Sequence, residues 1–144
     1  MITNTQTERE RKILYSVSVK GALATRLGEE RKKISTKLAL LKARKGEVLI
    51  GSAREIGRSH MADFDFSAFN NLNVLQREIE NCEKILHKIR KALFRLAGGR
   101  YGICEECDQN IRANRLVAVP WADKCTPCKT KKNEEEKRAK ARLH

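Results

Sequence analysis

Two closely spaced cysteine pairs constrain this chain more than any other feature of its sequence. The first pair is Cys104-Glu-Glu-Cys107 and the second is Cys125-Thr-Pro-Cys128, with 17 residues between them. Each CxxC turn presents two sulfurs to one ion, and two such turns complete a tetrahedron around zinc. Four protein ligands leave no coordination position for an activated water. The pattern therefore predicts one structural Zn²⁺ ion.

Two other uses of the four cysteines stay open at this point. They could be two redox-active CxxC motifs, although no thioredoxin-like alternation of strands and helices surrounds either pair. They could also hold an iron–sulfur cluster, although nothing else in the sequence suggests electron transfer. The three histidines, His60, His87 and His144, are scattered without ligand spacing, so we expect them at the solvated surface.

The most regular part of the chain is the segment 72–97, which predicts a helix. Its apolar residues alternate spacings of three and four, which is the heptad signature of a coiled coil. Gly98-Gly99 then supplies the left-handed stop that helix C-termini favour. Cys82 falls on this seam, where we expect a small buried side chain rather than a reactive thiol. The seam consists of Leu72, Leu75, Ile79, Cys82, Leu86, Ile89, Leu93 and Leu96.

A second helical segment, from about residue 8 to residue 45, has a matching seam. Its seam positions are Ala24, Leu27, Arg31, Ile34, Leu38 and Leu41. One antiparallel register places these positions opposite those of 72–97, for example Leu41 opposite Leu75. The seams predict an antiparallel helical hairpin, with a coiled-coil homodimer as the rival. The intervening residues 46–71 show little clear period, so they either lengthen the helices or form a loop.

The expected fold class is therefore mainly α: an antiparallel coiled-coil hairpin attached to a small four-cysteine zinc-finger module with a C-terminal helix. We expect an N-terminal segment (1–19), the hairpin (20–97, with its tip near 47–71) and the zinc-finger module (98–144). The C-terminal helix should begin with Thr126 at its N-cap and Pro127 at its first position. Tyr101 and Trp121 are expected in the core of the module rather than as stacking platforms for bases.

Charge narrows the class of partner. The formal net charge is +13, and residues 1–46 carry 12 basic against 4 acidic side chains. Residues 47–71 carry two arginines against four acidic residues, so a basic stem leads to a mildly acidic tip. This polarity favours polyanions or large acidic assemblies as partners. No signal peptide and no apolar stretch long enough for a membrane span occur, so we expect a cytoplasmic protein without membrane contacts.

No feature of the sequence suggests an enzyme, because it has no nucleophile–base pair, phosphate-binding loop or open metal site. A general nucleic-acid-binding zinc protein acting through its basic surface is one possible function. Its basic regions would be residues 1–46, with net charge +8, and residues 129–144, with seven basic and three acidic side chains. Such a protein should bind duplexes with a steep salt dependence.

The cysteine module resembles the DksA/TraR zinc-finger family over residues 98–131. Full-length DksA members also have a preceding helical hairpin, so the resemblance covers most of the chain. It implies a monomeric transcription regulator that binds RNA polymerase directly, without reading DNA. It also implies that the coiled-coil tip enters the secondary channel and modulates initiation, often together with the alarmone ppGpp. The resemblance rests on Tyr101-Gly-Ile-Cys104-Glu-Glu-Cys107, Ile111, Arg115-Leu116, Ala118, Pro120, Ala122-Asp123 and Cys125-Thr-Pro-Cys128-Lys129.

The resemblance also implies roles for residues at the hairpin tip. Family members place acidic tip residues near the catalytic centre of the polymerase, which makes Asp63 and Asp65 the tip candidates here. The family pattern Asp-x-x-Asp-x-Ala is replaced by Met61-Ala-Asp63-Phe-Asp65-Phe-Ser-Ala68, in which one aspartate aligns at a time.

Two further positions follow from the resemblance. Lys88 and Lys129 match positions of the alarmone site, which makes them the candidates for binding ppGpp, while Val119 stands where an arginine is expected. Asp108 replaces the glycine that usually follows the second cysteine. Since aspartate tolerates left-handed backbone geometry, we expect the turn to be preserved.

Overall fold

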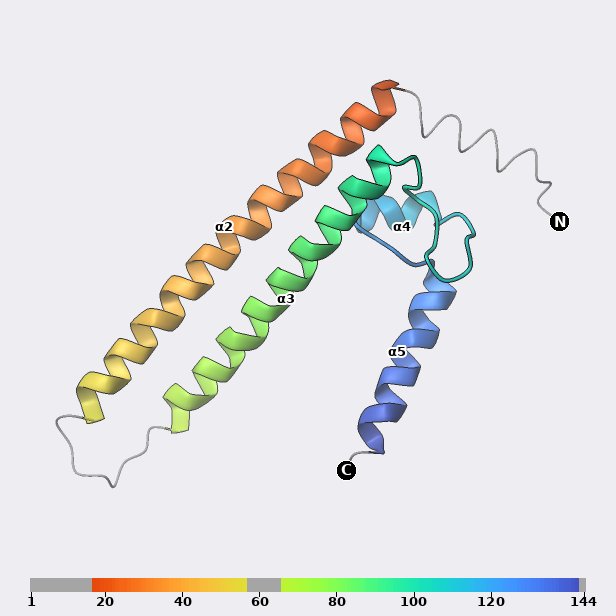
Figure 1. The fold of residues 1–144 in the computed structure, drawn as a ribbon. Helices are drawn as coiled ribbons and strands as arrows, with labels where there is room; N and C mark the ends of the chain where they lie inside the picture. The colour runs from red at the N-terminus through yellow and green to blue at the C-terminus, as the bar shows by residue number, and fades with distance from the viewer. Residues whose placement is uncertain (1–16, 57–65, 143–144) are drawn as a thin grey trace. The chain divides into compact units, whose positions relative to one another are not determined.

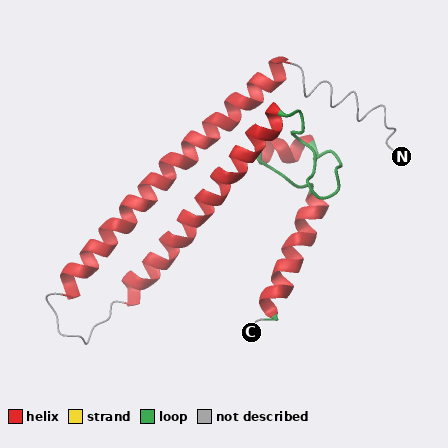
Figure 2. Ribbon diagram, viewed as in Figure 1, coloured by secondary structure: helices red, strands yellow, loops and turns green. Residues whose placement is uncertain are grey.

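The chain is helical over most of the residues that the structure, a computed structural model, describes, which are 17–56 and 66–142. They form α2 (Val17–Ile56), α3 (Phe66–Ala97), α4 (Ala113–Ala118) and α5 (Thr126–Ala141) (Figure 1). Extended structure in this part of the chain is limited to an isolated antiparallel bridge between Ile103 and Asn110 (Figure 2). The expected fold class is confirmed. Of the two alternatives for residues 46–71, the helices are longer, because α2 continues to Ile56 and α3 begins at Phe66.

The described residues divide into two compact units, and α2 and α3 contribute to both. The first, which we call the hairpin unit, comprises residues 30–56 and 66–87. The second, which we call the module unit, comprises residues 17–29 and 88–142. Within these ranges, no helix combines the length and the apolar content needed to cross a bilayer.

The hairpin unit is held together along the predicted seam. Its buried cluster consists of Leu41, Leu75, Ile79 and Cys82, with Ile34, Leu38 and Val48 packed against it. Cys82 is 2% exposed, which confirms its expected place as a small buried side chain. Burying a side chain of leucine or isoleucine stabilises a fold by about 1.5–3 kcal/mol, so this seam supplies most of the unit's stability.

Polar contacts across the hairpin unit confirm that its helices run antiparallel. The Lys42 Nζ and Glu83 Oε1 atoms lie 2.9 Å apart, and Lys45 Nζ donates a 2.7 Å hydrogen bond to Gln76 Oε1. Lys45 lies after Lys42 in α2, whereas its partner Gln76 lies before Glu83 in α3, as antiparallel helices require. Two seam positions of α2 differ from expectation, because Ala24 and Arg31 are both exposed. For Arg31, the charged guanidinium remains in water.

The module unit has a separate core. Leu27 of α2 and Ile89 of α3 are both 0% exposed, and Ala92 and Leu96 of α3 are also buried. Buried side chains that follow α3 complete this core, namely Tyr101, Ile111, Leu116 and Ala122. Tyr101 is therefore a core residue, as expected, and its Oη donates a 2.7 Å hydrogen bond to the carbonyl oxygen of Pro120.

The double glycine ends α3 as predicted. Gly99 has a φ of 73°, a left-handed conformation that glycine adopts without steric cost. Its N–H bonds the carbonyl of Leu96 at 3.3 Å, and the N–H of Arg100 bonds the carbonyl of Arg95 at 2.8 Å. These two bonds form a Schellman motif, which turns the chain from the helix into the first cysteine loop.

Candidate metal centre

The first cysteine pair lies in a tight hairpin-like turn. The N–H of Cys104 bonds the carbonyl of Gln109 at 2.8 Å, and the N–H of Asp108 bonds the carbonyl of Cys104 at 3.1 Å. Asp108 has a φ of 52°, so aspartate does adopt the left-handed conformation expected in place of glycine. Gly102, with a φ of 79°, makes the turn before the first cysteine, where a Cβ would lie 3.4 Å from Leu116 Cδ1.

The second cysteine pair is built on the start of α5. Cys125, rather than Thr126, is the N-cap residue, so the predicted N-cap was one residue late. No side chain caps this helix, and the extended backbone of Cys125 makes the transition instead, with φ −67° and ψ 166°. Pro127 lies within the first two helical positions, as expected. Cys128 therefore lies in the first turn of α5, near the positive end of the helix dipole, which favours thiolates.

The four sulfurs come together in a cluster of zinc-site dimensions. All four Sγ atoms lie within 4.8 Å of one another, and those of Cys107 and Cys125 are 3.7 Å apart. A tetrahedral site with Zn–S bonds of about 2.3 Å requires sulfurs roughly 3.8 Å apart. The N–H of Glu105 bonds the carbonyl of Asp123 at 2.9 Å, which ties the two cysteine turns together. These residues fit a single structural zinc ion, which would crosslink the two turns.

The electrostatics of the thiols also suit a dication. Burial raises the pKa of the Cys104 thiol, but hydrogen bonds from the backbone of Cys125 and Cys107 and from their thiols outweigh it and lower this pKa to about 7. The neighbouring side chain of Cys125 is the main cause that raises the pKa of Cys128 to about 12. Without a metal, the cluster thus favours a thiolate at Cys104 over thiolates at Cys107 and Cys128, whose pKa values are raised. A central Zn²⁺ would allow all four thiols to ionise, because its charge offsets their mutual repulsion.

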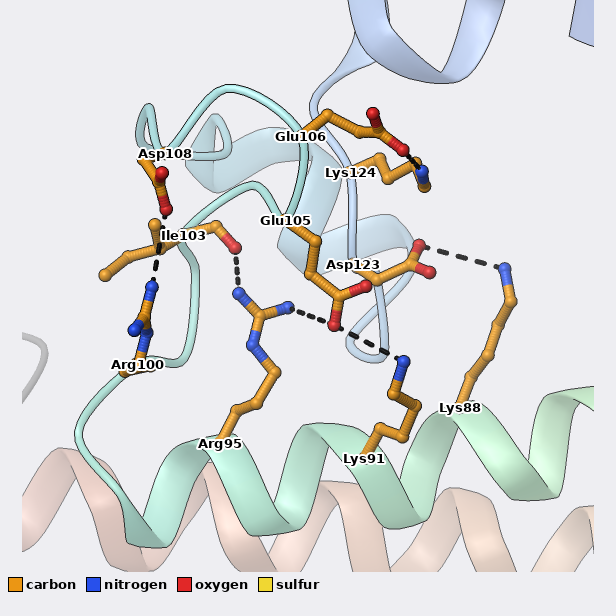
Figure 3. A network of polar contacts seen from close by, with 10 residues as sticks. All are labelled: Lys88, Lys91, Arg95, Arg100, Ile103, Glu105, Glu106, Asp108, Asp123 and Lys124. Carbon is orange, nitrogen blue, oxygen red and sulfur yellow. Dashed lines mark hydrogen bonds and ion pairs between the residues drawn. The ribbon is translucent and has the colours of Figure 1, made fainter. Parts of the chain in front are cut away.

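A polar network joins the cysteine turns to α3 (Figure 3). Lys91 Nζ and Arg95 Nη1 both lie 3.5 Å from Glu105 Oε1, and Lys88 Nζ lies 3.8 Å from Asp123 Oδ1. This network was not predicted from the sequence. The sequence does contain a signal for it, because Lys88, Lys91 and Arg95 recur at the spacings of three and four that place residues on one helix face.

Arginines make additional contacts with main-chain carbonyls of the module. Arg95 donates to Ile103, Arg26 of α2 donates to Val117, and Arg115 Nε donates to Lys124 at a distance of 2.8 Å. Lys124 is itself buried, at 7% exposure, and its ammonium is paired with the carboxylate of Glu106. Together these contacts satisfy polar groups of a module that has few apolar side chains.

The remaining candidates fall in different places. Lys88 and Lys129 are both half-buried, the first in the polar network on α3 and the second in the first turn of α5. Trp121 is also half-buried and lines a small pocket with Lys88, Lys91 and Asp123. His87 is exposed, as expected. The tip candidates Asp63 and Asp65 lie outside the described residues, as do His60 and His144.

Sequence comparisons with known proteins match parts of the chain, including the cysteine module. The model of the prokaryotic dksA/traR C4-type zinc finger matches residues 99–134. RNA polymerase-binding transcription factor DksA of Escherichia coli (strain K12) is 41% identical over 54 residues, which are 38% of this chain and 36% of that protein. General stress protein 16O of Bacillus subtilis (strain 168) is 34% identical over 65 residues, which are 44% of this chain and 39% of that protein.

The similarity to a solved structure extends over both parts of the fold. Transcription factor DksA2 from Pseudomonas aeruginosa matches with a TM-score of 0.65 and 25% identity, covering 86% of this chain and 91% of that one. The matches to curated relatives span about half of their length or less. The zinc-finger match over residues 99–134 and the helical fold shared with DksA2 together support a place for this chain in the DksA/TraR family of C4-type zinc-finger proteins.

Proposed function

We propose that this protein is a transcription regulator that binds RNA polymerase directly. The observation that carries the proposal is the structural match to transcription factor DksA2, because it includes the paired helices as well as the zinc finger. The relative in E. coli is named an RNA polymerase-binding transcription factor, which supports the same partner here. In this role the protein would act as a cytoplasmic monomer without enzymatic activity.

The helical hairpin would be the part that reaches into the polymerase. We propose that its tip enters the secondary channel and that Asp63 and Asp65 act near the catalytic centre. The charge pattern supports this mechanism, since a basic stem can follow an acidic channel wall while an acidic tip approaches a metal-containing site. The structural zinc would hold the two cysteine turns together.

The alarmone ppGpp is the proposed effector. Its phosphates would be bound by Lys88 and Lys129, which match the family's positions, although Val119 cannot supply the third cation. Lys88 is also 3.8 Å from Asp123, so the ligand would compete with this carboxylate. We therefore expect a weaker response to ppGpp than in family members with the arginine.

Co-purification with core RNA polymerase tests the proposal. The full chain and a variant lacking residues 47–71 would be compared for retention on immobilised core enzyme and for effects on initiation in vitro. We expect the full chain to bind and to alter initiation, and the shortened chain to lose the effect on initiation. Failure of the full chain to bind at moderate salt would overturn the proposal.

A gel shift with duplex DNA separates this proposal from general nucleic-acid binding. A nucleic-acid-binding zinc protein would shift duplexes, and its affinity would fall steeply between two salt concentrations. A polymerase-binding regulator should leave the duplex unshifted at salt concentrations that preserve the complex with core enzyme.

A further inference from the structure

We propose that the far end of the hairpin unit is a conformational device that opens on its own while the rest of the unit stays folded. We call this part the hairpin end and define it as residues 46–56 of α2 and 66–74 of α3. The proposal concerns the free protein and does not depend on the proposed function. Three observations support it: glycines that packing does not require, weak helix formers on both helices, and little burial.

Two glycines weaken the α2 part of the hairpin end. A Cβ added at Gly46 or Gly51 would meet no atom within 4 Å, so packing does not demand glycine at either position. Neither has a positive φ, so the backbone does not demand it either. Each glycine makes the helical state about two- to fivefold less favourable than alanine would. Alanine would therefore fit at either position and would make this part of α2 a more stable helix.

Neighbouring residues add to this weakness. Val48 and Ile50 lose side-chain freedom in a helix, and the hydroxyl of Ser52 bonds the carbonyl of Val48 at 2.9 Å, a contact that slightly destabilises helices. The facing part of α3 has three asparagines, Asn70, Asn71 and Asn73, whose amides compete with backbone hydrogen bonds. Strong helix formers dominate both helices beyond these segments.

Packing does not compensate for the weak propensity. Four large apolar side chains of the hairpin end remain about half exposed: Leu49 at 48%, Ile50 at 57%, Phe69 at 48% and Val74 at 56%. No side chain of the hairpin end whose exposure is described is fully buried. Of the hairpin end, the partly buried Val48 packs against the buried cluster, whose own members begin only at Leu41 and Leu75. The Lys45–Gln76 hydrogen bond also lies at that level. Opening the hairpin end therefore forfeits little apolar burial, whereas opening the rest would expose this cluster.

The device would give the protein two states of its hairpin end. In the closed state both helices continue to the limits of the hairpin end, and in the open state they end near the buried cluster. The half-exposed side chains of Leu49, Ile50 and Val74 can pack against a partner in either state. A partner that contacts one state better would shift this equilibrium, because binding selects among populated conformations.

Hydrogen exchange of the full-length, zinc-loaded protein tests the proposal. We expect peptides from 46–56 and 66–74 to exchange together and faster than those from 30–45 and 75–87. The double variant Gly46→Ala/Gly51→Ala should slow exchange in both segments by about 4- to 25-fold, since each alanine contributes about two- to fivefold. Gly21→Ala/Gly28→Ala is the matched control, because these glycines also have no atom within 4 Å of a Cβ but lie in the module unit.

The outcomes divide clearly. Slower exchange at the hairpin end in the first variant, and no change there in the control, would support the device. Equal exchange of the hairpin end and the rest of the hairpin unit in the wild type would overturn it. Slowing confined to 46–56, without any at 66–74, would also overturn it, since the two segments would then not open as one unit.

Discussion

Arg95, in the last turn of α3, donates a hydrogen bond from its guanidinium to the main-chain carbonyl of Ile103, the residue immediately before the first cysteine. The same guanidinium lies 3.5 Å from the carboxylate of Glu105, the residue immediately after that cysteine. One side chain thus contacts both neighbours of Cys104. Its own side chain is 15% exposed, so these contacts are largely shielded from water.

Replacing Arg95 with alanine should therefore weaken the metal centre as well as the fold. A lost hydrogen bond that involves a charged group costs about 1.5–3 kcal/mol, and partial burial keeps this case within that range. We expect Arg95→Ala to lower the free energy of unfolding by about 2 kcal/mol and to speed zinc release to a competing chelator. Chemical denaturation and chelator-driven release measure the two effects.

Arg100→Ala is the matched control for this prediction. Arg100 also pairs with an acidic residue of the cysteine loop, at 3.3 Å from Asp108, but the two side chains are 69% and 78% exposed. An ion pair this exposed contributes roughly 0–1 kcal/mol. Equal effects of the two substitutions would show that burial of the Arg95 contacts is not what matters.

Metal removal should unfold the cysteine module while leaving the hairpin unit helical. The buried hydrophobic side chains between the two cysteine pairs are Ile111, Leu116 and Ala122, whereas the hairpin unit has a buried cluster of its own. Trp121 is the single tryptophan of the chain and is half-buried in the module, so its fluorescence reports on the module alone. With a strong chelator we expect release of one zinc per chain, a red shift of this emission and retention of most far-UV helical signal.

Adding Zn²⁺ back should restore the emission, whereas Mg²⁺ should not, because four thiolates form a soft ligand set that magnesium avoids. A chain that keeps the native emission after complete chelation would contradict the assignment of Cys104, Cys107, Cys125 and Cys128 as structural ligands.

Tyr101 should make the stability of the module depend on alkaline pH. Burial raises the pKa of its phenol above the ordinary value of 10.0, and the nearby Arg26 only partly offsets this effect. The folded state therefore holds the proton more tightly than the unfolded state does. This contribution is fully present below pH 10 and is lost as pH rises through the higher pKa of the folded protein.

The variant Tyr101→Phe isolates this effect because phenylalanine cannot ionise. At pH 8 it should be less stable than the wild type by about 0.5–1.5 kcal/mol, since it loses the hydrogen bond to Pro120. Above pH 10 the difference in unfolding free energy should narrow, because only the wild type is destabilised by its unfavourable ionisation of a buried phenol. Unfolding free energies of both proteins from pH 8 to pH 11 check this; a constant difference would contradict it.

The sequence predicted those features that depend on periodicity or on a fixed ligand spacing. The heptad seam from Leu72 to Leu96, the stop at Gly98-Gly99 and the clustering of four cysteines follow from local rules that few tertiary contacts can override. The left-handed conformation of Asp108 was also predictable, because the turn after the second cysteine requires it whichever residue stands there.

Contacts made by side chains far apart in sequence were not predictable in the same way. Arg26 and Val117 are separated by 91 positions, and only the packing of α2 and the module brings them together. The burial of Lys124 depends likewise on Glu106 and on the loop between the cysteine pairs. The end of α2 was left open between helix and loop, because the glycines at 46 and 51 and the β-branched residues between them interrupt the helical pattern, although the helix itself continues.

Charge reversal at the tip tests the proposed mechanism most directly. If Asp63 and Asp65 act near the catalytic centre, replacing both with lysine should abolish or invert the effect on initiation by exchanging attraction for repulsion at a metal-containing site. Binding to core polymerase should persist, because the stem and the module are unchanged. Glu78→Lys/Glu80→Lys is the matched control, since both residues are exposed on α3 outside the tip and the charge change is the same. Unaltered transcription by the tip variant in a bound complex would refute the role of the tip, while loss of binding in both variants would trace the effect to net charge.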